Sequence, residues 1–279
     1  AGKYESYFCP NQGNVEENLA YLTDAIAQVY ASALRAEPII YRQQTALIDY
    51  DERIAVLIQF VEGEKFGDYF LPHGAGVAFS RNLYRWSADI KREDGFLRLV
   101  WGMGTRAVDQ TGNDYPRLVA LSRPLLHPAD NIKALQRYSQ QYVDAIDLKA
   151  NQLRTIPINE IISSRYPPLR YIAQNVGEGY LSTIHTNLID TEKLVITFDE
   201  LLRRTDFAEE MKTALQLLEK HYKAPVDTEF AIKILNARAI QPEVEITLLQ
   251  CRPQSHILEE DEIHLPENIE KENILFSHK

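Results

Sequence analysis

The spacing of hydrophobic residues predicts two amphipathic helices. Between residues 14 and 35, apolar residues recur at alternating steps of four and three, the period of one helix face: Val15, Leu19, Leu22, Ile26, Val29 and Ala33. Asn14 precedes this series and is suited to the N-cap position. A second series follows Asp206, which has a carboxylate three residues further on at Glu209 and so matches a capped helix start: Phe207, Met211, Leu215, Leu218 and Tyr222.

Short runs of apolar or β-branched residues, bounded by polar or glycine-containing turns, predict strands. The predicted strands are 53–62, 75–80, 96–101, 226–235 and 244–252, with a further candidate near 142–148. Residues 127–200 have the least regular pattern and are interpreted as a connecting or subfamily-specific region. Together the segments predict an α/β (α+β) fold with a mixed or antiparallel sheet flanked by helices.

Composition narrows the class of protein. Hydrophobic residues make up 45% and charged residues 25%, which is typical of soluble globular domains, and no segment approaches the roughly 20 apolar residues that span a bilayer. We expect a cytoplasmic protein without a membrane partner, whose two cysteines, Cys9 and Cys251, are reduced. The formal charge of -10 argues against a nucleic-acid partner, because such binding needs clustered basic residues.

Two successive predicted strands near the C-terminus carry the most informative polar pattern. Asp227 and Glu229 alternate with apolar residues, so they share one face of the first strand. Gln250 and Arg252 share a face of the second, and the Pro-containing stretch 236–243 is long enough to reverse the chain. In a hairpin that is symmetric about its middle, Glu229 faces Gln250 and Asp227 faces Arg252.

The chemistry of this cluster suits a phosphorylated ligand. A carboxylate beside an amide oxygen offers the hard ligands that Mg²⁺ prefers, and Mg²⁺ shares its coordination shell with substrate phosphates. A neighbouring guanidinium supplies donors for a phosphate and stabilises the charge that develops during phosphoryl transfer. The alternative, from spacing alone, is a surface ion pair between Asp227 and Arg252 worth about 0 to 1 kcal/mol.

Beyond this spacing, VDTEF at 226–230 followed by LLQCRPQ at 248–254 resembles the closing signature of the nucleotide-binding domain in the phosphoenolpyruvate synthase and pyruvate phosphate dikinase family. Further segments resemble that domain in the same order: AGKYESY at 1–7, AVLIQFVEGE at 55–64, GAGVAFSRN at 74–82 and WGMGTRAV at 101–108. The resemblance implies an ATP-grasp-like fold over most of 1–122 and 226–254.

The resemblance also implies roles for individual residues. Glu229 and Gln250 would hold the Mg²⁺ that accompanies ATP, and Arg252 and Asp227 would be catalytic at the phosphate end. The implied nucleotide-contacting positions are Gly2 in a phosphate-covering loop, the hinge residues Gln59, Phe60 and Val61, and Gly76, Gly104 and Thr105. Thr105 departs from the pattern, because the family commonly has a glutamate there. Each implied contact has a structural alternative. Gln59 could be a polar residue at the edge of a buried strand, and the glycines could be ordinary turn or loop residues.

For the full-length enzyme, the resemblance implies transfer of phosphate from ATP through a histidine to pyruvate, giving phosphoenolpyruvate, AMP and phosphate. No histidine of this chain lies in the glycine-rich context expected of the phosphate carrier. Pyruvate is therefore expected to be bound through further domains, and a homodimer of the full-length enzyme is also considered.

The domain boundaries follow from the two ends of the chain. The chain opens at Ala1 and Gly2 without a Met, so we expect a partial ATP-grasp domain at 1–256 that lacks its beginning. Residues 257–279 are expected to form an acidic linker toward a downstream domain, and the fragment alone is expected to be inactive. Two alternative functions stay open: another dikinase, such as a glucan or antibiotic phosphotransferase, and a degenerate, non-catalytic nucleotide-binding module, which Thr105 favours.

Overall fold

The computed structural model describes residues 4–51, 53–82, 84–108, 114–177, 179–185 and 190–254. Its α-helices are α1 Val15–Ser32, α2 Ala36–Gln44, α3 Thr105–Val108, α4 Ile132–Arg137, α5 Ile158–Ile161, α6 Leu169–Ile172, α7 Asp199–Arg204 and α8 Phe207–Tyr222. Its strands are β1 Glu64–Phe66, β2 Tyr69–Leu71, β3 Gly74–Phe79, β4 Phe96–Val100, β5 Arg117–Ala120, β6 Tyr142–Asp147, β7 Gln152–Pro157, β8 Ala173–Val176, β9 Leu181–Ser182, β10 Leu194–Ile196, β11 Val226–Leu235 and β12 Glu243–Pro253. Short 3₁₀ turns lie at Arg92–Asp94 and Thr191–Lys193.

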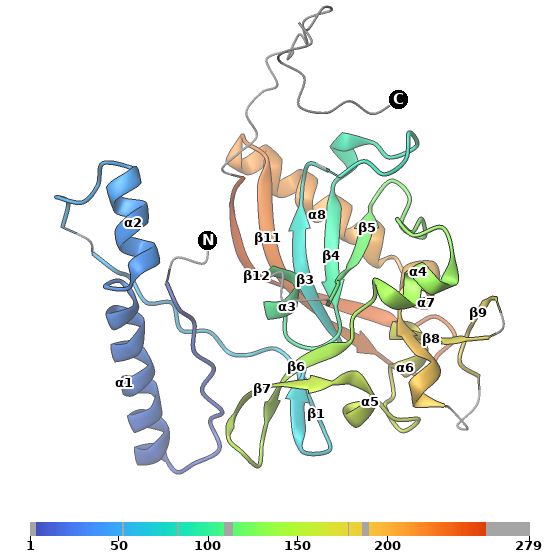
Figure 1. Ribbon diagram of the computed structural model, residues 1–279, viewed down its shortest axis with the longest axis horizontal. Helices are drawn as coiled ribbons and strands as arrows, with labels where there is room; N and C mark the ends of the chain where they lie inside the picture. Colours follow the sequence, from blue (N-terminus) through green and yellow to red (C-terminus); the bar gives the residue numbers. More distant parts are fainter. Residues whose placement is uncertain are drawn as a thin grey trace, which may run out of the picture.

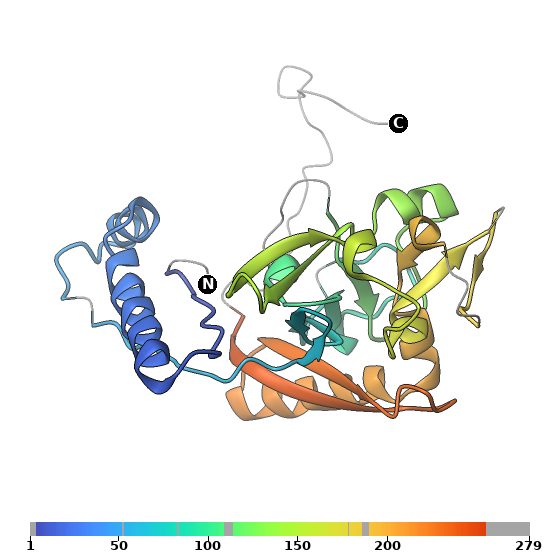
Figure 2. The same cartoon turned by 90° about the horizontal axis from the view of Figure 1, so that it is seen from below.

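A five-stranded antiparallel sheet in the order β12-β11-β3-β4-β5 forms the centre of the molecule (Figure 1). The long helix α8 packs along one face of it, beneath the β11–β12 hairpin in the view of Figure 2. Phe207 of α8 meets Phe230 of β11 there, with ring centroids 6.0 Å apart, and both side chains are buried. The predicted strands 75–80, 96–101, 226–235 and 244–252 are confirmed as β3, β4, β11 and β12.

Two smaller antiparallel sheets, β1-β2-β6-β7 and β10-β8-β9, pack beside the central one. Residues 127–200, interpreted from sequence as a connecting region, supply most of these strands, including β6 at the position predicted near 142–148. Val143, Tyr171 and Leu201 from this region belong to the same buried cluster as the strands of the central sheet. Structurally the region is therefore part of the core.

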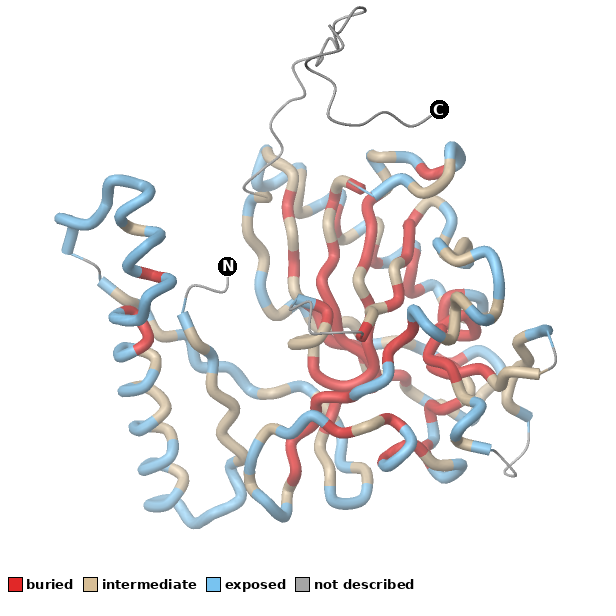
Figure 3. The backbone as a smooth tube through the Cα atoms, viewed as in Figure 1, coloured by how far each residue is buried: buried red, intermediate tan, exposed pale blue. Residues whose placement is uncertain are grey.

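The two predicted helices are present. α1 begins at an Asn14 N-cap, and the side chain of Glu17 completes the reciprocal capping box. α8 follows Asp206 as expected, but the Asp206 side chain makes no capping hydrogen bond, so the proposed acidic cap is corrected. α1 and α2 lie to one side of the sheets and are largely exposed (Figure 3). No helix among the described residues is long and apolar enough to cross a membrane.

The predicted strand at 53–62 is wrong. Its described residues form no strand, and β1 starts only at Glu64. Leu57 and Phe60 are 73% and 94% exposed, so the apolar run that suggested a buried strand is not covered by the described part of the chain. A strand needs a neighbour for its backbone groups as well as a suitable pattern, and none of the described strands pairs with this segment. The expected linker at 257–279 lies outside the described residues.

Candidate functional site in the C-terminal hairpin

The β11–β12 hairpin has the predicted register. Asp227 pairs directly with Arg252 and Glu229 with Gln250, and a bulge after Glu229 then shifts the pairing by one residue. Because directly opposed residues in an antiparallel pair project to the same side, these four side chains lie on one face. The alternate residues of β11 face α8 and are buried, so the polar four occupy the opposite, more accessible face of the sheet.

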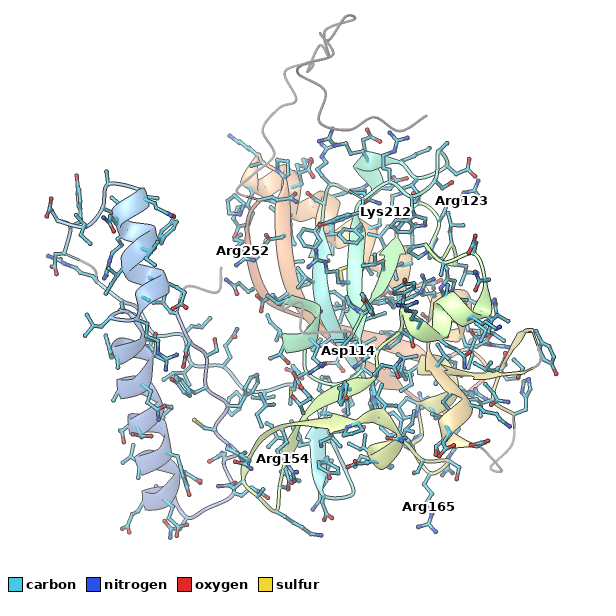
Figure 4. All side chains as sticks on the ribbon, in the orientation of Figure 1. Asp114, Arg123, Arg154, Arg165, Lys212 and Arg252 are labelled. Carbon is cyan, nitrogen blue, oxygen red and sulfur yellow. The ribbon has the colours of Figure 1, made fainter. Side chains whose placement is uncertain are left out.

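Asp227 and Arg252 form the clearest interaction of this face. Arg252 Nε donates to Asp227 Oδ1 at 2.5 Å, with side chains 30% and 13% exposed. Figure 4 shows Arg252 on β12, the outer strand of the central sheet, on the side toward α1 and α2. The carboxylate holds the guanidinium in a fixed orientation, and the remaining N–H groups of Arg252 can donate to an anionic ligand.

The oxygen atoms of Glu229 and Gln250 are available for a ligand. Among the described residues, neither side chain makes a hydrogen bond or ion pair, although the two residues are direct cross-strand neighbours. No group of three or more His, Cys, Asp or Glu residues among those described could hold a metal ion. The carboxylate of Glu229 and the amide oxygen of Gln250 are hard oxygen ligands of the kind that Mg²⁺ accepts, and Mg²⁺ that is bound to phosphates usually takes only one or two ligands from the protein.

The hinge residues are only partly in place. Gln59 Nε2 donates to the Leu249 carbonyl at 2.8 Å, so its side chain contacts the hairpin next to Gln250. Phe60 is 94% exposed and Val61 is half-buried, and neither belongs to a strand. Among the predicted hinge residues, Gln59 is thus the one whose side chain bonds to the backbone of β12 in the described part of the chain.

Packing accounts for Gly76 and Gly102 but not for Gly104. Gly76 is buried in the middle of β3, where a Cβ atom would lie 1.9 Å from the Arg98 carbonyl oxygen. At Gly104 an added Cβ would make only an ordinary contact, 3.5 Å from Ala75 Cβ, so packing does not require glycine there. Gly102 has φ +87° and packs on Val143, which excludes any side chain. Gly2 lies outside the described residues.

Thr105 does not project freely. Its hydroxyl donates to Asp144 Oδ2 at 2.6 Å, and Arg106 Nη1 donates to the other oxygen of Asp144 at 3.2 Å. Arg106 also pairs with Asp114, which Figure 4 labels close to α3. Burial opposes the charge of Arg106, but its hydrogen bonds to Asp114 and the charges of both aspartates raise its pKa. This network could not be predicted from the sequence, because its members come from separate elements without a shared local motif.

A second cluster lies further along β11, beyond Glu229. Glu64 accepts from Lys233 Nζ at 2.6 Å and from His73 Nε2 at 3.2 Å. His73 Nδ1 accepts the Ile234 N–H at 2.9 Å, so the Nε2 atom carries the proton that binds Glu64. The hydrogen bond from Lys233 to Glu64 lowers the pKa of Glu64, while burial lowers the pKa of His73. This cluster could not be predicted from the sequence, since its three residues lie far apart in the chain and share no local motif.

Comparison with known proteins identifies the domain. The family model for the pyruvate phosphate dikinase AMP/ATP-binding domain matches residues 1–273. Comparison with curated proteins gave no match. The family match agrees with the resemblance carried by the two hairpin segments and extends through the region 127–200. The chain therefore belongs to the pyruvate phosphate dikinase AMP/ATP-binding domain family, and its α+β fold is ATP-grasp-like.

Proposed function

We propose that this domain binds MgATP for a phosphoenolpyruvate synthase-type enzyme, which converts ATP, pyruvate and water into phosphoenolpyruvate, AMP and phosphate. The observation that carries the proposal is the pairing of Asp227 with Arg252 and of Glu229 with Gln250 on the open face of the hairpin. Family membership supports ATP as the ligand. Phosphate passes through a histidine carried by another part of the enzyme, and pyruvate is bound outside this domain.

Each residue of the hairpin has a distinct task in this proposal. Glu229 and Gln250 would hold Mg²⁺, which would neutralise phosphate charge and orient the phosphate chain. Arg252 donates to the phosphoryl oxygens and stabilises the negative charge that grows on them during transfer. Asp227 contacts Arg252 directly and keeps the guanidinium aimed at the phosphates. Gln59 orients the hinge against β12, where backbone groups near Phe60 and Val61 would meet adenine.

A second candidate function is nucleotide binding without phosphoryl transfer. The observation that favours it is the engagement of Thr105 with Asp144, since this hydroxyl is already satisfied within the protein. In that case the domain would sense ATP, and the hairpin would hold the nucleotide without a transfer step.

The complete protein should be incubated with MgATP, with and without pyruvate, and the products separated. Without pyruvate, the proposed reaction stops after one round, with AMP, phosphate and a phosphorylated histidine as products. With pyruvate, the histidine passes its phosphoryl group to pyruvate, so phosphoenolpyruvate and AMP accumulate together over many turnovers. Phosphohistidine without phosphoenolpyruvate would indicate a dikinase with another acceptor. Binding of ATP with no phosphohistidine would reject the proposal in favour of the nucleotide-binding module.

A further inference from the structure

Arg98 shares the face of the sheet that carries the hairpin site. On β4 it pairs directly with Val77 of β3, and Val77 pairs with Glu229 of β11. Glu229 in turn pairs with Gln250, so these four residues form one row across four strands. Side chains in such a row project to the same side of the sheet. Neighbouring strands lie roughly 4.8 Å apart, which puts the Arg98 backbone about 10 Å from that of Glu229.

The Arg98 guanidinium is held beside the phosphate end of this face. Its Cζ atom lies 5.8 Å from the ring centroid of Phe79 and 5.8 Å from that of Tyr84. Phe79 is the direct neighbour of Asp227, so Arg98 leans from its own row toward the row of Asp227 and Arg252. Arg98 Nη2 also contacts the Tyr84 hydroxyl at 3.4 Å. The two rings orient the guanidinium and leave its edge accessible.

The charges of this face make Arg98 the available cation. Arg252 is already paired with Asp227, and Glu229 adds a second negative charge without a basic partner in the described residues. Within the part of the chain that the structure describes, no carboxylate lies within ion-pair distance of Arg98. A polyphosphate that approaches this face therefore meets one neutralised arginine and one arginine whose charge is not offset.

We propose that Arg98 is a further phosphate-contacting residue of this site and binds the terminal phosphates of the nucleotide from the β4 side. Arg252 and Arg98 then approach the phosphate chain from opposite sides of β11 and β3. This inference rests on the proposed function, because it assumes that a nucleotide polyphosphate occupies the hairpin face. A residue that contacts the terminal phosphates affects the binding of ATP and leaves the binding of AMP, which lacks those phosphates, unchanged.

The test is calorimetric binding of ATP, ADP and AMP, each with Mg²⁺, to the complete protein and its Arg98→Met and Arg98→Lys variants. Arg98→Met removes the charge but keeps an unbranched side chain over the rings. We expect ATP affinity to fall about 10- to 100-fold, the range for a charge-assisted hydrogen bond, with AMP affinity unchanged. Arg98→Lys should recover part of the loss, since lysine keeps the charge but lacks the planar fork.

Arg137→Met is the matched control. Arg137 is an exposed arginine of α4, outside the strands of the central sheet, and its Cζ lies 5.6 Å from the ring centroid of Tyr138. It should leave the affinity for all three nucleotides unchanged. If Arg137→Met weakens ATP binding as much as Arg98→Met, the effect is one of overall charge and the inference is overturned.

Other outcomes separate this inference from the proposed function. If Arg252→Ala weakens ATP binding and Arg98→Met does not, the inference fails and the proposed function stands. Equal losses for ATP and AMP, accompanied by a lower melting temperature, would assign Arg98 a structural role and also overturn the inference. If the unmodified protein binds no nucleotide, both the inference and the proposed function are rejected.

Discussion

Asp227 and Arg252 face each other across the β11–β12 pair, with Arg252 Nε 2.5 Å from Asp227 Oδ1. An ion pair at a partly exposed position contributes little to folding, about 0 to 1 kcal/mol. An arginine that stabilises a phosphoryl-transfer transition state contributes much more to the rate, about a thousandfold or more. The two roles can be separated, because one affects stability and the other turnover.

Arg252→Ala in the complete enzyme is expected to lower kcat about a thousandfold while it changes the free energy of unfolding by about 1 kcal/mol or less. Steady-state kinetics and thermal unfolding of the same preparation measure both quantities. Arg154→Ala is the control, because Arg154 pairs with Asp147 at 2.9 Å on the sheet of β6 and β7, remote from Arg252 in Figure 4. If Arg252→Ala lowers the melting temperature but keeps normal kinetics, Arg252 serves only as a structural ion pair and has no catalytic role.

Glu229→Gln tests the magnesium site. The substitution keeps the shape of the side chain but replaces a charged oxygen ligand with a neutral one, so Mg²⁺ affinity should fall. Removing even a residue that only hydrogen-bonds to a metal ligand typically lowers metal affinity or activity about 10- to 100-fold. We therefore expect the Mg²⁺ concentration for half-maximal activity to rise at least about 10-fold. Glu243→Gln, an exposed glutamate at the other end of β12, should change nothing. Equal Mg²⁺ requirements in both variants would contradict the assignment.

The sequence predicted the pairing of the two hairpin strands better than the structure around them. Alternation of polar and apolar residues in the two strands was sufficient to pair Glu229 with Gln250 and Asp227 with Arg252, because the period of a strand is fixed by its backbone. The bulge after Glu229 was not foreseen, but it lies beyond the four residues and leaves their pairing intact. The roles of these residues, as distinct from their positions, remain predictions.

The failures have a common physical cause. The 53–62 segment has a strand-like pattern, but whether a strand forms depends on a partner that a local pattern does not specify. The hydrogen bonds from Thr105 and Arg106 to Asp144 join residues that are 39 and 38 positions apart in the sequence. Local periodicity carries no information about such contacts. They required the three-dimensional arrangement of α3 and β6.

Gly102→Ala is expected to destabilise the fold strongly. Gly102 has φ +87°, and an added Cβ would lie 2.3 Å from Val143 Cγ2 and 2.7 Å from the Asp144 carbonyl oxygen. The backbone strain and the overlap together should cost about 3 kcal/mol or more, measured by chemical denaturation. Gly179→Ala is the control, because Gly179 has nearly the same φ, +86°, with nothing within 4 Å of its Cβ position. It should cost only the strain, about 1 to 2 kcal/mol. Equal losses would show that packing against β6 is unimportant.

His73 should make stability depend on pH below neutrality. Burial lowers the pKa of His73 from its ordinary 6.5, so the folded state favours the neutral ring that accepts the Ile234 N–H. Below about pH 6.5 the unfolded chain binds a proton more readily than the folded one. The stability that this residue contributes is therefore complete above that pH and is lost as the pH falls through the lowered pKa, at no more than about 1.4 kcal/mol per pH unit.

The neighbouring carboxylate responds at lower pH, which separates the two contributions. The hydrogen bond from Lys233 lowers the pKa of Glu64 from its ordinary 4.5, so its contribution is complete above that value and lost only below it. Melting temperatures between pH 7.5 and 5 should therefore fall less steeply in His73→Gln than in the unmodified protein, because glutamine cannot take up a proton. His221→Gln, at an exposed position on α8, should retain the original slope. An unchanged slope in His73→Gln would show that the protonation of His73 is not coupled to folding.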